Sequence, residues 1–99
     1  MNHQDAESME QLFRAILQLH TPEECEQFFT DLCTIKELQD MAQRLATAKM
    51  LDEGAKYKTI SDSVHISTAT ISRVSRCLNY GTGGYRAALD ALKAPEDAQ

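Results

Sequence analysis

Tryptophan is absent from this chain of 99 residues, and there are only two prolines. Because proline breaks helices, its scarcity suits a helical fold. No apolar run approaches the roughly 18 residues that a membrane-spanning helix needs. The first residues lack the basic start and the apolar core of a signal peptide. We therefore expect a cytoplasmic protein that forms a single small domain.

Patterns typical of disulfides, metal sites or catalysis are also absent. The cysteines are odd in number and form no C-x-x-C pair, so we expect reduced, partly buried thiols. Whether Cys77 is redox-active stays open. The histidines lack the spacing of zinc ligands, and we expect no metal. The chain has no glycine-rich phosphate loop and no nucleophile with an evident base, which argues against an enzyme. The residues concerned are Cys25, Cys33, Cys77, His3, His20 and His65.

The charge is unevenly distributed along the chain, although the formal net charge is −5. Residues 1–40 carry nine acidic and two basic side chains, whereas residues 41–80 carry six basic and three acidic ones. A locally basic surface is what binding to DNA phosphates requires. The middle segment therefore suits a nucleic-acid partner. The acidic segment is interpreted as a solvated face or a dimer surface.

Residues 57–79 have the apolar pattern of a helix-turn-helix. Ile60 and Val64 are four residues apart and share one face of a short first helix. Ile71, Val74 and Leu78 form a single stripe on a second helix. The same pattern would also fit an amphipathic helix pair inside a helical bundle, so the exposed residues must decide between the two interpretations.

The turn and the exposed face of the second helix favour DNA binding. Ser67 or Thr68 can cap this helix. His65 departs from the motif, because it occupies the turn position that is most often glycine, and a positive φ there would cost a residue with a Cβ, although histidine tolerates it better than most. The helix begins with residues 68–70, whose short side chains allow a close approach to base edges. Further side chains project away from the apolar stripe, and these are Ala69, Ser72, Arg73 and Arg76.

Four further segments complete the expected architecture, which is all-α with five to six helices. We expect helices over residues 5–19, from Thr21 and Pro22 onward, over 34–53 with Gly54 as its C-terminal cap, and over 84–93. Residues 94–99 are expected to form a loose tail. The apolar helices of residues 1–53 have no domain of their own. They are interpreted as dimerisation helices within one domain of residues 1–99, the alternative being that they fold back onto the helix-turn-helix.

The stretch from Cys33 to Gly81 resembles the tryptophan-repressor (TrpR) superfamily and is most similar to its YerC/YecD branch. Four blocks carry the resemblance, at residues 34–38, 43–45, 68–73 and 76–81. The resemblance implies a TrpR-like intertwined homodimer in which each chain presents one helix-turn-helix. Helix-turn-helix dimers, the tryptophan repressor among them, place their reading heads roughly 34–36 Å apart. The expected partner is therefore double-stranded DNA with a palindromic operator.

The resemblance also assigns roles by position. Residues 68–70 match the tip that faces bases, Lys58 matches a basic position that reaches DNA, and Ser61 and Ser72 match positions near phosphate. Together with the capping and exposed residues, the candidate DNA-binding set is Lys58, Ser61, Ser67, Thr68, Ala69, Thr70, Ser72, Arg73 and Arg76.

A candidate effector pocket follows from the same resemblance. Arg44 and Arg73 match the two arginines that sandwich a bound tryptophan, and Thr34 matches a residue that lines the pocket. Two positions depart from the family pattern, because Val74 replaces a glycine and Cys77 replaces a serine. We therefore expect no cofactor and do not expect tryptophan to be a co-repressor, while another small effector stays open.

The sequence thus predicts a sequence-specific transcriptional regulator, a repressor, that acts as a homodimer. The alternative is a helical dimerisation or adaptor protein that no longer binds DNA. The operator, the regulated genes and the choice between repression and activation are not encoded in the pattern.

Overall fold

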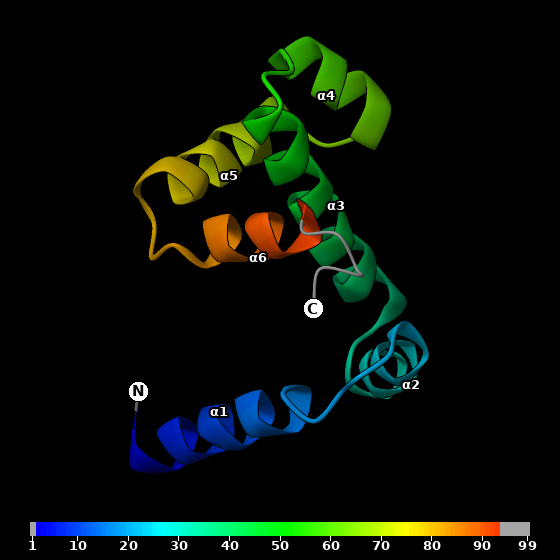
Figure 1. Cartoon of the computed structure of the whole chain (residues 1–99), viewed down its shortest axis with the longest axis vertical. Coiled ribbons are helices and arrows are strands. Elements are labelled where there is room, and N and C mark those ends of the chain that lie inside the picture. The colour runs from blue at the N-terminus through cyan, green and yellow to red at the C-terminus, as the bar shows by residue number, and fades with distance from the viewer. Residues whose placement is uncertain (1, 94–99) are drawn as a thin grey trace. The chain divides into compact units, whose positions relative to one another are not determined.

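Six helices make up the chain in a computed structural model that describes residues 2–93. They are α1 (His3–Ile16), α2 (Pro22–Leu32), α3 (Ile35–Asp52), α4 (Tyr57–Val64), α5 (Thr68–Tyr80) and α6 (Gly84–Lys93) (Figure 1). No strand occurs between residues 2 and 93. The all-α prediction is confirmed, and the expected tail at 94–99 lies outside the described residues. Within that range, no helix is long and apolar enough to span a membrane.

The chain divides into two compact units, residues 1–38 and residues 39–99. The first unit holds α1, α2 and the first turn of α3. The second holds the remainder of α3 together with α4, α5 and α6. The assignment of residues 1–53 to dimerisation within a single domain stays a prediction.

In the first unit, side-chain caps fix where the helices begin. The α1 helix starts at His3, earlier than predicted, because the Asn2 side chain accepts a hydrogen bond of 2.8 Å from the Asp5 N–H. It also ends earlier, at Ile16 rather than at residue 19. The predicted start of α2 is confirmed, since Thr21 Oγ1 accepts the Glu24 N–H at 3.1 Å.

The long helix α3 has both of the predicted terminal signals. Thr34 Oγ1 accepts the Glu37 N–H at 3.1 Å, and Glu37 Oε1 accepts the Thr34 N–H at 2.8 Å, which forms a reciprocal capping box. The backbone N–H and the hydroxyl of Thr34 both stabilise the carboxylate, so the pKa of Glu37 is lowered. Gly54 ends the helix with φ +87°, in the left-handed region that glycine adopts without a Cβ clash.

The core of the second unit lies where α3, α5 and α6 meet. Ala48, Val74 and Leu89 are buried there, one from each of these helices. Both α6 and α4 pack on α5 (Figure 1). Leu51, Leu78 and Tyr85 pack around the buried residues. This core holds α5 against two other helices.

An ion-pair cluster on Asp52 joins the ends of α3 and α6. Asp52 accepts a hydrogen bond of 2.7 Å from Lys93 Nζ and lies 2.8 Å from Arg86 Nη1, while its side chain is only 13% exposed. The hydrogen bond from Lys93, and then that from Arg86, lowers the pKa of Asp52. The partners are 34 and 41 residues away in sequence, so no local pattern predicts this cluster.

Candidate DNA-binding surface

The helix-turn-helix is formed by α4 and α5, as predicted. Ile60 of α4 and Ile71 and Val74 of α5 are buried, so both predicted apolar faces point inward. Val64, Ile66 and Leu78 are half-buried at the edges of this packing. Ser61, the small residue on α4, is half-buried as well. The apolar stripe therefore leaves the opposite side of α5 exposed.

The turn between the helices passes through His65. Its φ of 59° and ψ of 48° lie in the left-handed region, and its N–H donates to the Ser61 carbonyl at 3.1 Å. His65 is the only non-glycine residue with positive φ between residues 2 and 93. The turn therefore has the backbone conformation that favours glycine, although histidine occupies it, and the chain passes from α4 into α5 within three residues.

Ser67, and not Thr68, caps α5. Its Oγ accepts the Thr70 N–H at 3.2 Å and lies 2.9 Å from Thr70 Oγ1. The Thr70 hydroxyl is thereby engaged in the cap, and Thr70 is half-buried. Thr68 and Ala69 are exposed in the first turn of the helix. At the tip of α5, these two residues offer the most accessible side chains.

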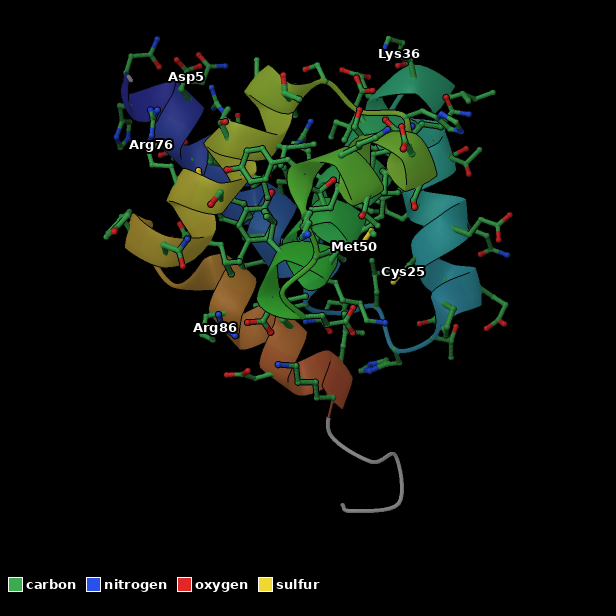
Figure 2. The ribbon with its side chains drawn as sticks, turned by 90° about the horizontal axis from the view of Figure 1, so that it is seen from above. Asp5, Cys25, Lys36, Met50, Arg76 and Arg86 are labelled. Atoms are coloured by element: carbon green, nitrogen blue, oxygen red, sulfur yellow. The ribbon has the colours of Figure 1, made fainter. Side chains whose placement is uncertain are left out.

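The exposed side of α5 continues with Ser72, Arg73 and Arg76. Arg76 extends outward from the helix (Figure 2). On α4, Lys58 lies at the surface, and its Nζ is 3.3 Å from Asp62 Oδ2. Between residues 54 and 89 the only acidic residue is Asp62, whereas the basic residues are Lys56, Lys58, Arg73, Arg76 and Arg86. The segment that forms the helix-turn-helix therefore carries more basic than acidic side chains.

The predicted effector residues of the second unit, Arg44, Arg73, Val74 and Cys77, differ in exposure. Val74 is 1% exposed and fills the core, so it has no surface to offer a ligand. Arg73 is exposed beside it on α5, and Arg44 is half-buried on α3. Thr34 belongs to the other compact unit, where its hydroxyl caps α3. Cys77 lines a hollow in the second unit.

That hollow has a volume of about 500 Å³ and lies beside the loop that follows α5. Its lining is mostly apolar or glycine, and it consists of Leu45, Cys77, Gly81, Thr82, Gly84, Tyr85 and Ala88. Sequence reasoning missed six of these seven residues, although the glycines at 81, 83 and 84 marked the loop. Cys77 is exposed here, so the expected partial burial is wrong for this thiol. Cys25 and Cys33 are half-buried, and all three are free.

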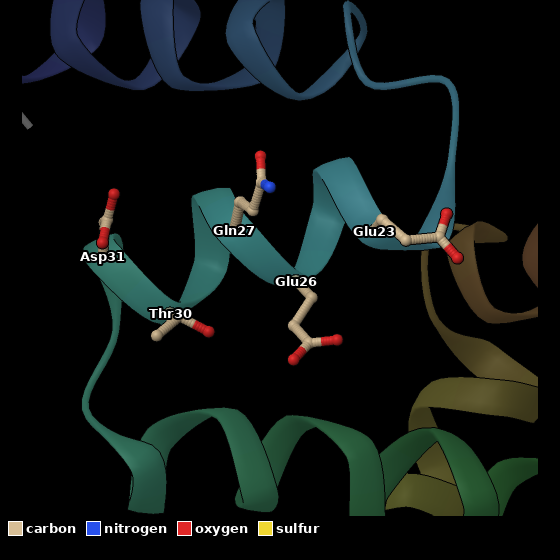
Figure 3. Close-up of a pocket in the computed structure, with 5 residues that line it drawn as sticks. All are labelled: Glu23, Glu26, Gln27, Thr30 and Asp31. Carbon is tan, nitrogen blue, oxygen red and sulfur yellow. The ribbon is translucent and has the colours of Figure 1, made fainter.

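A second hollow, of about 630 Å³, lies on α2 and has the opposite character. Its lining residues are Glu23, Glu26, Gln27, Thr30 and Asp31, which project from several sides of the helix (Figure 3). Three of the five side chains are carboxylates, which repel phosphate. Within the described part of the chain, no three His, Cys, Asp or Glu residues are grouped to hold a metal ion.

Comparisons with known proteins agree with this architecture. Residues 7–93 match the family model described as Trp repressor protein. The chain is 56% identical over 88 residues to the uncharacterized protein YerC of Bacillus subtilis (strain 168), covering 89% of this chain and 85% of YerC.

Two crystal structures are similar in fold and in sequence. A TrpR-like protein from Eubacterium eligens ATCC 27750 superposes with a TM-score of 0.85 at 47% identity, covering 91% of this chain and 93% of that one. A "putative Trp repressor" from Staphylococcus aureus superposes with a TM-score of 0.85 at 44% identity, covering 96% and 97%. Both similarities extend over nearly the whole chain and include the helix-turn-helix.

Proposed function

Because this chain belongs to the Trp repressor family of DNA-binding regulators, we propose that it represses transcription as a homodimer that binds a palindromic DNA operator. The observation that carries the proposal is the exposed, acid-free side of α5, which lies opposite the buried face of Ile71 and Val74. A recognition helix reads the major groove with its N-terminal residues, and α5 presents short side chains there.

Each exposed group has a role that follows from its chemistry and position. Thr68 and Ala69 at the tip of α5 contact base edges, where a hydroxyl can bond and a methyl group can pack on thymine. Arg73 and Arg76, further along the helix, neutralise phosphates. Lys58 on α4 contacts the sugar-phosphate backbone of the DNA. The remaining hydroxyls, those of Ser61, Ser67, Thr70 and Ser72, are assigned to further hydrogen bonds with phosphate, although Ser67 and Thr70 also bond each other in the cap of α5.

The homodimer is supported by how little apolar surface a single chain buries. Neither α1 nor α2 has a buried residue, although both helices are rich in large apolar side chains. Leu17 is 74% exposed and Ile35 is 76% exposed. The other large exposed hydrophobics in the described range include Met9, Phe13, Leu32 and Leu92. Exposed apolar surface of this extent is typical of an interface between protein chains.

Two-fold symmetry of the dimer determines the operator. A dimer that presents two identical α5 helices binds half-sites of opposite orientation, separated by about one helical turn of DNA. Tryptophan is not the co-repressor in this proposal, since Val74 fills the core beside Arg73. A different small effector would have to bind elsewhere than at Val74.

The decisive experiment is selection of bound duplexes from a random DNA pool by the full chain, followed by affinity measurement on the recovered sites. A palindromic consensus supports the proposal. The Arg76→Ala variant should weaken binding to every duplex and flatten the salt dependence by about one unit. The matched control is Arg14→Ala on α1, where the arginine pairs with Glu10, and its DNA affinity should not change.

A dimerisation or adaptor protein without DNA affinity is the second candidate, and the net charge of −5 favours it. Such a protein would bind neither selected nor mixed-sequence DNA at low salt. Light scattering of the free protein tests the homodimer independently of DNA binding. A monomer at micromolar concentration would contradict the homodimer under either function.

A further inference from the structure

Asp62 contradicts the local rules of the helix on which it lies. It is in the last turn of α4, where the negative end of the helix dipole disfavours an acidic side chain. It follows Lys58 by four residues, which is the less favourable order for an ion pair on a helix. Both side chains are largely exposed, at 89% for Lys58 and 68% for Asp62, and such pairs add little to stability. The stability of α4 therefore does not account for Asp62.

Its position relative to the basic surface offers a reason. Asp62 is the single acidic residue between residues 54 and 89, a stretch with five basic residues. Its Oδ2 lies 3.3 Å from the Nζ of Lys58, the cation of α4 that is assigned to the DNA backbone. A carboxylate at this place occupies the Lys58 ammonium in the free protein. Near DNA it also repels phosphates.

We propose that Asp62 determines specificity by suppressing loose binding to arbitrary DNA through Lys58. This inference rests on the proposed DNA-binding function. Binding to phosphates alone is sequence-independent, and each neutralised phosphate contributes to it equally on every duplex. Withholding the Lys58 contact lowers that background. At an operator, base contacts from the tip of α5 fix the register, and Lys58 can exchange Asp62 for a phosphate.

The expected size follows from counterion release. One phosphate contact contributes a slope of about −0.9 in log affinity against log salt, so that affinity changes about eightfold for each tenfold change in salt concentration. Replacing Asp62 with Asn frees Lys58 and should therefore strengthen binding to mixed-sequence DNA about five- to tenfold. The helix should be as stable as before or slightly more stable, because the unfavourable carboxylate is removed.

The test compares Asp62→Asn with Asp90→Asn on α6. Asp90 follows Arg86 by four residues at 3.9 Å, is exposed, and lies outside the helix-turn-helix. The Asp90→Asn variant thus has the same change in net charge. It also loses an ion pair in which the basic residue precedes the acidic one by four positions, as in Lys58 and Asp62. Affinity for a mixed-sequence duplex is measured by fluorescence anisotropy between 50 and about 200 mM KCl, the range over which phosphate contacts alter affinity most.

We expect Asp62→Asn to raise affinity and to steepen the salt slope by about one unit, whereas Asp90→Asn should stay within about twofold of the parent. In a Lys58→Met background the gain from Asp62→Asn should fall below about twofold. Equal effects at Asp62 and Asp90, a weaker Asp62→Asn variant, or a full gain without Lys58 would each overturn the inference. A parent protein that binds no DNA would instead refute the proposed function.

Discussion

The turn at His65 gives the sharpest test of the helix-turn-helix geometry. Its φ of 59° and ψ of 48° place a side chain with a Cβ in the left-handed region. The imidazole is exposed and makes no hydrogen bond or ion pair with any residue from 2 to 93. Substitutions at this position therefore report on the backbone conformation rather than on lost contacts.

The magnitudes follow from two opposing effects. A residue with a Cβ in the left-handed region costs roughly 1–2 kcal/mol, which glycine avoids. Glycine also gives the unfolded chain more conformational freedom, which costs about 0.4–1 kcal/mol. We expect His65→Gly to raise the free energy of unfolding by up to about 1 kcal/mol. His65→Val should lower it by about 1–2 kcal/mol, because a β-branched side chain is a clear outlier at positive φ.

The assay is urea unfolding followed by helical circular dichroism, at one fixed chain concentration because a dimer's stability depends on it. His65→Ala keeps the Cβ without the ring and should match the parent. As a neighbouring control, Ser63→Gly within α4 should be destabilising by roughly 0.5 kcal/mol, which is opposite in sign to His65→Gly. If the valine and glycine variants at position 65 were equally stable, the left-handed turn would be refuted.

Four further outcomes are expected. Leu89→Ala should cost about 3 kcal/mol in unfolding free energy, since Leu89 is buried in the core, whereas Leu89→Met should cost less than about 1.5 kcal/mol. Ser67→Ala removes the cap of α5 and should cost about 1 kcal/mol by urea unfolding. The lowered pKa of Asp52 means that its stabilising effect is present above its unfolded pKa and is lost as pH falls through the lower folded value, so Asp52→Asn should flatten the loss of stability below about pH 4 in acid titrations. Millimolar tryptophan should change operator affinity no more than a few fold. A tenfold tightening, equal to about 1.4 kcal/mol of coupling, would contradict the argument that Val74 excludes tryptophan.

The features that sequence reasoning predicted well are those encoded within a few residues. Thr21 and Thr34 are capping signals with their acceptors three residues from their donors, and Gly54 ends its helix where expected. The apolar stripe of α5 and the unusual turn at His65 follow from periodicity and from position within the motif. The family and its YerC branch, predicted from four short blocks, are confirmed by the comparisons.

The features that sequence reasoning missed depend on contacts between residues far apart in the sequence. Asp52 has no local partner, and only the folding of α6 brings Arg86 and Lys93 to it. Val74 belongs to an apolar stripe, so its burial was predictable, but its assignment to an effector pocket came from resemblance and took no account of that burial. The hollow beside Cys77 arises from a loop, where side-chain periodicity says nothing.

Buried apolar side chains are unevenly distributed between the two halves of the molecule. Every fully buried apolar side chain in the described range belongs to α3, α4, α5 or α6, and none belongs to α1 or α2. The helix-turn-helix thus has a core within one chain, which fixes which side of α5 is exposed. The apolar side chains of α1 and α2 have no such core, so the proposed second copy would have to supply it. If that is correct, dilution should unfold α1 and α2 before the helix-turn-helix, because only their stability depends directly on chain concentration.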